Sequence, residues 1–219
     1  MERSSIMTKK AVEFENRIQL RGTIVNVRNT DKCLIYILAA RTDRKTGNSS
    51  NPQVFVRKDA GFPIYKKGDT INVLAHLATK RKQQPDGKKV YIKTIFADDI
   101  SLCTRRLVRE GVDCEDRFNG GLEDDINRFL FAGEFVRTYE PFPGMLVYTL
   151  MIKRINELGR EEIAYADISC YRNGIMALNG AKPGDFIAAA GYVRAKYRPE
   201  KGRILTSYIA RDVELFARE

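Results

Sequence analysis

The side chains in this chain that are best suited to chemistry are cations and aromatic rings, gathered in two short segments. The first segment holds five cations on either side of a Pro-Asp-Gly turn, namely Lys80, Arg81, Lys82, Lys88 and Lys89. The second segment interleaves cations with tyrosine, as Arg194, Lys196, Tyr197 and Arg198. Cations neutralise phosphates, and flat side chains stack on unpaired bases. The pattern therefore indicates binding of a single-stranded polyanion. The alternative is two charged hairpin tips that keep strand edges from aggregating.

Further candidates follow from the alternation of side chains along a strand. In two strand-like runs, at residues 53–58 and 164–172, the inward positions would be Val54, Val56, Ile168 and Cys170. The outward positions would then be Phe55, Arg57, Ser169 and Tyr171. Phe55 and Tyr171 could stack on bases, and Arg57 could stack or hold a phosphate. Ordinary packing or a subunit contact is the alternative for these residues.

The remaining candidate contacts lie near these strands and hairpins. They are Arg21, Tyr36, Tyr91, Tyr148 and Arg172. Tyr36 and Tyr148 occupy matching places in two apolar runs, where they could equally be strand residues that cover a core.

No arrangement of residues points to an enzyme. Asp98-Asp99 and Glu161-Glu162 are adjacent carboxylates, and neighbours in a strand face opposite ways. The single histidine, His76, has no evident nucleophile as a partner, and no G-x-x-x-x-G-K-[ST] loop is present. The four cysteines lack C-x-x-C spacing, which argues against a zinc site. We therefore expect neither a catalytic centre nor a cofactor or metal.

The charge of the chain favours an anionic partner. The 219 residues carry 38 Lys and Arg against 28 Asp and Glu, a formal net charge of +10. Residues 1–109 carry a net charge of +13, residues 110–125 carry −6, and residues 126–219 carry +3. Such an excess fits nucleic acid or an acidic membrane surface. No apolar run approaches the length of a membrane span, and the first residues lack the apolar core of a secretion signal. We therefore expect no membrane partner and a cytoplasmic, reducing location.

The elements that must position these residues are strands, and they occur twice. The run Lys67–Leu74 reappears in degenerate form as Pro183–Ala190. The first copy predicts strands at residues 18–28, 33–41, 53–58, 69–81 and 89–97. The second predicts strands at residues 129–136, 145–154, 164–172, 185–196 and 203–210. Gly22 and Gly133 take the same place in the first strand of each copy, where a bend would let that strand serve two sides of a small barrel.

Five strands with a short segment between the third and fourth are typical of the OB-fold, a five-stranded Greek-key barrel. The sequence thus predicts an all-β protein with two tandem OB-folds. We expect OB-fold domain 1, strongly basic, at residues 1–107. An exposed acidic linker would follow at residues 108–125, and OB-fold domain 2 at residues 126–219.

The order of these features resembles the bacterial single-stranded DNA-binding proteins (SSB). In the second copy the matching residues are Ile168–Arg172, Lys182–Asp185 and Ala190–Val193. In the first copy they are Val54–Lys58, Lys66–Asp69 and Ala75–Leu77. Two departures stand out. The chain contains no tryptophan, whereas the family stacks bases on tryptophans. It also stops soon after its last predicted strand, so we do not expect the acidic tail with which the family recruits partner enzymes.

The resemblance implies single-stranded DNA binding without sequence preference, and protection of that DNA in replication, recombination or DNA transfer. It also implies a possible homodimer, which would restore the four barrels of the usual family assembly. Two alternatives remain open from the residues. The chain could be an OB-fold module for protein interaction or oligomerisation. It could also bind RNA, because stacking and phosphate contacts serve both polymers.

Overall fold

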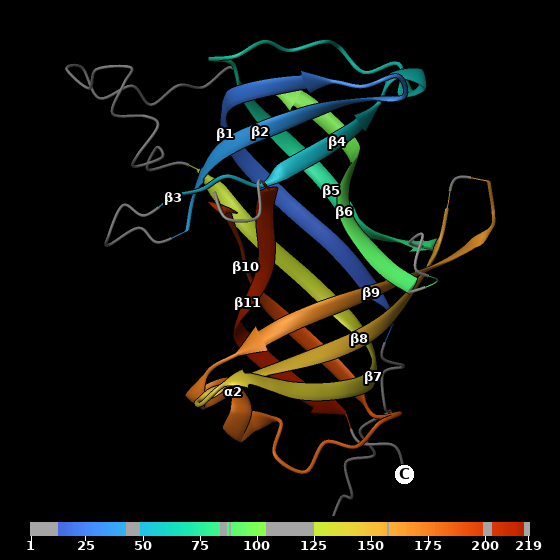
Figure 1. Cartoon of the computed structure of the whole chain (residues 1–219), viewed down its shortest axis with the longest axis vertical. Coiled ribbons are helices and arrows are strands. Elements are labelled where there is room, and N and C mark those ends of the chain that lie inside the picture. The colour runs from blue at the N-terminus through green and yellow to red at the C-terminus, as the bar shows by residue number, and fades with distance from the viewer. Residues whose placement is uncertain are drawn as a thin grey trace, which may run out of the picture.

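Two strand barrels make up the described part of the protein (Figure 1), a computed structural model covering residues 13–42, 49–83, 87, 89–103, 125–156, 158–198 and 203–216. The strands of barrel 1 are β1 (Glu15–Asn29), β2 (Cys33–Arg41), β4 (Gln53–Arg57), β5 (Thr70–Gln83) and β6 (Lys89–Leu102). Two short elements accompany them, β3 (Ser49–Ser50) and the 3-10 turn η1 (Lys58–Ala60). Antiparallel pairing joins β4 to β2, β2 to β1, β1 to β5 and β5 to β6, and a parallel pairing of β4 with β6 closes the barrel.

Barrel 2 repeats this connectivity. Its elements are β7 (Ile126–Phe142), β8 (Met145–Ile155), β9 (Glu161–Cys170), α2 (Arg172–Ala177), β10 (Phe186–Arg198) and β11 (Arg203–Phe216). The parallel pairing of β9 with β11 closes it. The prediction of two tandem OB-folds is therefore confirmed.

The glycines of the first strands are required by close backbone contact. A Cβ on Gly22 would lie 2.3 Å from the Ala39 carbonyl oxygen, and one on Gly133 would lie 2.5 Å from the Met151 carbonyl oxygen. Next to Gly22, β1 stops pairing with β5 and begins pairing with β2. The strand therefore serves two sides of the barrel from this position, as predicted.

The repeated Gly-Asp turn is held in the same way in both barrels. The Asp69 carboxylate accepts a hydrogen bond from the Lys66 backbone N–H (2.8 Å), as the Asp185 carboxylate does from that of Lys182 (2.7 Å). Gly68 and Gly184 have φ of 94° and 98°, in the left-handed region that favours glycine. In both barrels the backbone of this turn also hydrogen-bonds to the first strand, at Ile24 and at Phe135.

The last strands run further than predicted. β6 ends at Leu102 and β11 at Phe216, whereas the sequence predicted ends at residues 97 and 210. A β-bulge lies at each predicted end, where Asp98 and Arg211 are the extra, unpaired residues of the strand. A charged residue that breaks the alternation resembles a strand end in the sequence, although pairing resumes beyond it.

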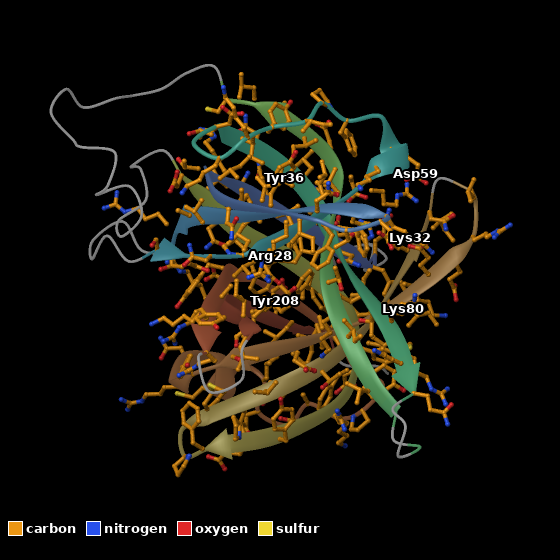
Figure 2. All side chains as sticks on the ribbon, turned by 45° about the horizontal axis from the view of Figure 1, so that its top comes forward. Arg28, Lys32, Tyr36, Asp59, Lys80 and Tyr208 are labelled. Atoms are coloured by element: carbon orange, nitrogen blue, oxygen red, sulfur yellow. The ribbon has the colours of Figure 1, made fainter. Side chains whose placement is uncertain are left out.

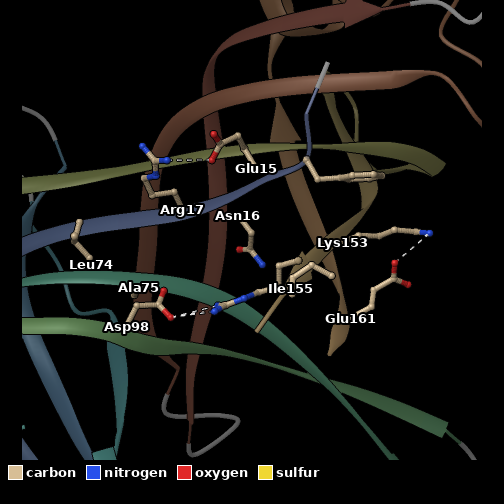
Figure 3. A pocket seen from close by; sticks show the side chains of 11 residues that line it. Glu15, Asn16, Arg17, Leu74, Ala75, Asp98, Lys153, Ile155 and Glu161 are labelled. Atoms are coloured by element: carbon tan, nitrogen blue, oxygen red, sulfur yellow. Dashed lines mark hydrogen bonds and ion pairs between the residues drawn. The ribbon is translucent and has the colours of Figure 1, made fainter. Parts of the chain in front are cut away.

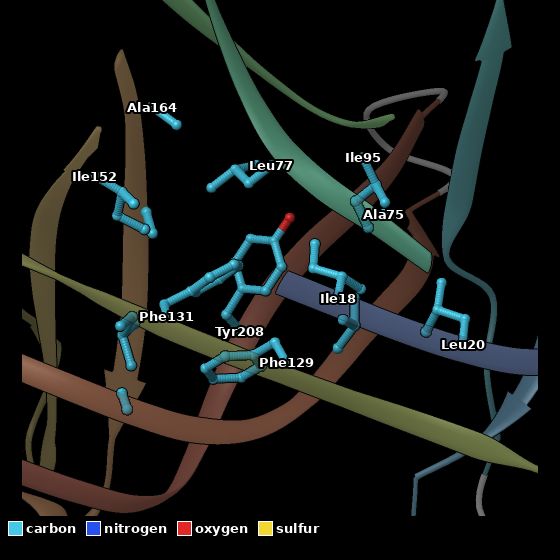
Figure 4. Packing of buried hydrophobic residues seen from close by; sticks show 14 of the residues in the cluster. Ile18, Leu20, Ala75, Leu77, Ile95, Phe129, Phe131, Ile152, Ala164 and Tyr208 are labelled. Atoms are coloured by element: carbon cyan, nitrogen blue, oxygen red, sulfur yellow. The ribbon is translucent and has the colours of Figure 1, made fainter. Parts of the chain in front are cut away.

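The two barrels are joined edge to edge. β1 pairs with β7 from Glu15 opposite Ala132 to Arg21 opposite Ile126, so that all strands belong to one eleven-stranded sheet. Buried residues from both barrels form a single core cluster, in which Tyr208 of β11 lies close to Ile18 and Leu77 (Figure 4). The predicted linker lies outside the described residues except for Asp125. That residue is buried rather than exposed, and its carboxylate accepts the backbone N–H of Arg41 (3.2 Å).

Candidate nucleic-acid interface

The first basic segment belongs to a long hairpin that leaves its own barrel. The hairpin formed by β5 and β6 extends from barrel 1 across strand β9 of barrel 2 (Figure 1). The Thr79 hydroxyl accepts a hydrogen bond from the Tyr165 backbone N–H (2.9 Å). The Lys93 ammonium pairs with the Asp167 carboxylate, and the rings of Tyr91 and Tyr165 lie 5.9 Å apart. The cations of barrel 1 therefore reach the surface beside the second and third strands of barrel 2.

The second hairpin, formed by β10 and β11, makes the reciprocal contact. The Ala195 backbone N–H donates to the Ser50 hydroxyl (2.7 Å), and its carbonyl accepts the Asn51 N–H (3.0 Å). Ala195 holds the position in barrel 2 that Thr79 holds in barrel 1, because each lies ten residues after the aspartate of its Gly-Asp turn. OB-folds bind oligonucleotides on the face of strands two and three and on the flanking loops. Each barrel thus places cations beside that face of the other barrel.

The predicted hairpin residues within the described part are exposed. They are Lys80, Arg81, Lys82, Arg194, Lys196 and Arg198, with Tyr91 at 52% and Tyr197 at 57% exposure. Lys88 and the side chain of Lys89 lie outside the described part. This dense set of cations with intervening rings has the composition of a single-strand binding surface.

The strand positions chosen by alternation largely lie as predicted. Val54, Val56, Ile168 and Cys170 are buried, whereas Arg57, Tyr171 and Arg172 are exposed. Arg57 lies 3.9 Å from the Asp59 carboxylate, and Phe55 is half-buried against Phe96. Arg21 is half-buried and donates to the Asn72 side-chain oxygen (2.6 Å). Ser169, which the alternation places at an outward position, is buried.

Two predicted contacts are wrong. Tyr36 is fully buried, and its hydroxyl accepts the backbone N–H of Tyr65 (2.9 Å). Tyr148 is also buried, and its ring packs 5.4 Å from that of Phe135. Desolvation raises the pKa of both phenols. These tyrosines cover the barrel cores, so they are removed from the candidate interface.

Sequence reasoning missed several residues that the fold places at this surface. Tyr139 and Phe142, in the hairpin between β7 and β8, are 46% and 52% exposed. In barrel 1 the corresponding turn carries the exposed cations Arg28 and Lys32 (Figure 2). The segment Glu140-Pro141-Phe142-Pro143-Gly144 offered a signal, because aromatic residues beside a Pro-Gly turn lie in a loop rather than in a core.

Two contacts related by the repeat connect the barrels at the bulges. In the first, the Asp98 carboxylate is hydrogen-bonded to His76 Nδ1 (2.7 Å). It also accepts a hydrogen bond from the Arg154 guanidinium of barrel 2 (3.3 Å), the contact that Figure 3 draws as a dashed line. In the second, Arg211 lies over the Tyr192 ring (5.0 Å) and donates to the Thr42 carbonyl of barrel 1 (2.8 Å). We call these the His76 contact and the Tyr192 contact.

The electrostatics of the His76 contact are set by its neighbours. Partial desolvation would raise the pKa of Asp98, but the hydrogen bond and charge of His76, together with Arg154, lower it below the usual value. Asp98 therefore stays ionised at neutral pH, as an anionic partner for Arg154.

The described residues contain no group of His, Cys, Asp and Glu side chains that could hold a metal ion. Within the same residues, no helix is long and apolar enough to cross a membrane.

Comparison with known proteins finds similar structures but no match by sequence. No protein-family model matches the chain, and no curated protein matches it in sequence. The wild-type single-stranded DNA-binding protein from Thermus aquaticus superposes with a TM-score of 0.61 at 19% identity, covering 95% of this chain and 96% of that one. A deletion mutant of that protein gives a TM-score of 0.60 at 18% identity, covering 94% and 97%. The chain therefore has an SSB-like fold over nearly its full length.

Proposed function

We propose that this protein binds single-stranded DNA without sequence preference and protects it. The observation that carries the proposal is the reciprocal crossing of the two hairpins. The Thr79 contact brings the exposed Lys80, Arg81 and Lys82 beside strand β9 of barrel 2, and the Ala195 contact brings the exposed Arg194 and Lys196 beside β3 of barrel 1. Both faces thereby gain cations from the other barrel, and exposed rings lie between them. The similarity of the fold to the Thermus aquaticus protein supports this reading.

The biological role would follow from this binding. A strand coated by the two barrels is kept unpaired and shielded, as replication, recombination and DNA transfer require. We place this role in the cytoplasm. We propose a binding protein rather than an enzyme.

A homodimer is part of the proposal. Leu74 of β5 and Leu130 of β7, which pair with Gln19 and Arg17 of β1, are 43% and 37% exposed. A second copy would cover these apolar side chains and bring four barrels together. Light scattering coupled to size exclusion should give twice the mass of 25.0 kDa for the free protein.

Fluorescence anisotropy of labelled oligo(dT) tests the binding. We expect saturable binding whose logarithmic affinity falls linearly with the logarithm of salt concentration, because displaced counterions are released. Duplex DNA of the same length serves as the control and should compete poorly. If a matched RNA oligonucleotide competes better than DNA, the protein is an RNA-binding protein. If the anisotropy does not change at micromolar protein, the proposed binding of single-stranded DNA is wrong.

A further inference from the structure

Three aromatic side chains lie side by side on the outer surface of barrel 1, where polar residues are the rule. Phe55 of β4 is paired with Phe96 of β6, which is paired in turn with His76 of β5. The ring centroids of Phe55 and Phe96 lie 5.8 Å apart, and those of Phe96 and His76 lie 6.2 Å apart with an interplanar angle of 22°. We call these three residues the aromatic row.

Barrel 2 lacks this row. The positions with the same pairing there hold Ser169, Ile209 and Tyr192. If the fold required aromatic rings at these positions, both barrels would carry them, since they share the same strand connectivity. The row is therefore a property of barrel 1 that the fold alone does not explain.

The row opens on a groove between the barrels. His76 and Phe96 form part of one wall, and Arg154, Leu158 and Ile163 of barrel 2 form part of the other. The groove holds about 670 Å³, a size common among sites for small molecules. Leu158 and Ile163 are 76% and 42% exposed. The groove thus offers apolar and aromatic surface to a flat group.

The charged side chains inside the groove lie close to opposite charges. Asp98 is bound by His76 and Arg154, and Glu162 lies 3.9 Å from the Arg154 guanidinium. Asp59 lies 3.9 Å from Arg57. The lining thus holds three carboxylates and two guanidiniums, each within ion-pair distance of an opposite charge, and an uncharged group fits it better than an anion.

The cations at the rim of the groove suit an anion. Exposed Arg57 lines its edge, and exposed Lys58 follows directly in the chain. The Lys58 backbone N–H donates to the Lys32 carbonyl (3.1 Å), which brings the exposed Lys32 to the same end of barrel 1 (Figure 2). A group that fits this arrangement has a flat neutral part and an adjoining negative charge. An unpaired nucleotide has both.

We propose that this groove receives one unpaired base of the bound strand, stacked against Phe96 and His76, with the neighbouring phosphates on Arg57, Lys58 and Lys32. The inference rests on the proposed binding of single-stranded DNA. It adds a base site built on the aromatic row, whose counterpart positions in barrel 2 hold Ser169, Ile209 and Tyr192, and so gives the strand a fixed place on the protein.

Photo-crosslinking of the full chain tests the site directly. Oligo(dT) carrying 5-iododeoxyuridine is bound, irradiated and digested, and the modified residues are mapped by mass spectrometry. We expect adducts on Phe96 or His76, together with adducts on the hairpin tyrosines. Adducts confined to Tyr91, Tyr165 and Tyr197, with binding intact, overturn the groove site alone. Absence of any binding overturns the groove site and the proposed function together.

A pair of matched variants gives an independent readout. Phe96→Leu removes the ring but keeps an apolar side chain, and we expect it to weaken oligo(dT) binding about 5-fold or more, the loss of one stacking contact. Ile209→Leu changes the equivalent position of barrel 2 and should leave the affinity unchanged. Circular dichroism confirms that both variants are folded. Equal affinities for Phe96→Leu and Ile209→Leu would contradict the site.

Discussion

Ile18 and Phe129 lie opposite each other in the ladder between β1 and β7, and they hold the same position in the two repeats, four residues before Gly22 and Gly133. A local two-fold axis therefore passes between them. The contacts of one barrel recur on the other side of this axis, as in an isologous dimer interface. Asn16 and Asn127 show this closely: each side-chain amide makes two hydrogen bonds to the fourth strand of its own barrel, at Leu77 and Val193.

The basic hairpin of barrel 1 provides the first prediction. Replacing Lys80, Arg81 and Lys82 by Gln should weaken oligo(dT) binding and reduce the salt slope by up to roughly 2, since each phosphate contact on a single strand contributes about 0.7. Anisotropy titrations at several salt concentrations measure both effects. The control replaces the exposed Lys66 and Lys182, which lie at the Gly-Asp turns before the fourth strands, whereas the hairpin tips follow those strands. An unchanged salt slope in the triple variant would show that the hairpin does not touch phosphates.

The ring pair Tyr91 and Tyr165 provides the second prediction. The chain has no tryptophan, so its intrinsic emission comes from its ten tyrosines. Stacking of bases should quench part of this emission when oligo(dT) binds. Replacing Tyr91 and Tyr165 by Leu should remove part of the quenching and weaken binding about 5-fold or more, as expected for loss of base stacking. If the double variant keeps both its full quenching and its affinity, bases do not stack at this pair.

Tyr36 provides the third prediction, with the opposite expectation. Tyr36→Phe removes the acceptor for the Tyr65 N–H, so we expect a loss of about 1 kcal/mol in the free energy of unfolding. Urea denaturation followed by circular dichroism measures this loss. Affinity for oligo(dT) should stay at the wild-type value, because the ring lies in the core. A clear loss of affinity in the folded variant would return Tyr36 to the interface.

Asp98 provides the fourth prediction. Its pKa is lowered in the folded protein, so its ionised form adds stability above the unfolded value of 3.8, and that stability is lost as the pH falls through the folded pKa. Asp98→Asn should therefore be less stable than wild type near neutral pH. The difference in unfolding free energy should shrink as the pH falls below about 4. Denaturation curves at several pH values test this, and a difference that stays constant down to pH 2 would contradict the assignment.

Strand positions followed from the sequence because most strands have one wet face and one buried face. Strand β2 is the exception that misled the reading of Tyr36. Residues Tyr36 to Ala40 are all buried, although neighbouring side chains point to opposite faces of the sheet. Because the residues on both sides of Tyr36 are apolar, the sequence around it does not alternate between apolar and polar residues. The side to which Tyr36 points could therefore not be predicted, whereas the alternation in β4 placed Phe55 correctly.

The joining of the barrels could not be read from the sequence. The alternation of apolar and polar residues predicts which face of a strand is buried, but not which element packs against that face. Thr79 and Ala195 carry no sign that each contacts the opposite barrel. Likewise, the strand pattern identified the basic hairpins as exposed tips, and only the fold shows that their stems lie across the neighbouring barrel.

The two contacts at the bulges have a consequence for how such a protein can change. In a symmetrical homodimer, one mutation alters both occurrences of an interface contact at once, so each residue must suit both. In this protein, different residues of one chain form the two inter-barrel contacts. His76 with Asp98 occupies one, and Tyr192 with Arg211 occupies the other. Fusing the repeats into one polypeptide frees each half of the interface to vary independently, so specialised features can accumulate in one barrel while the other keeps the original role.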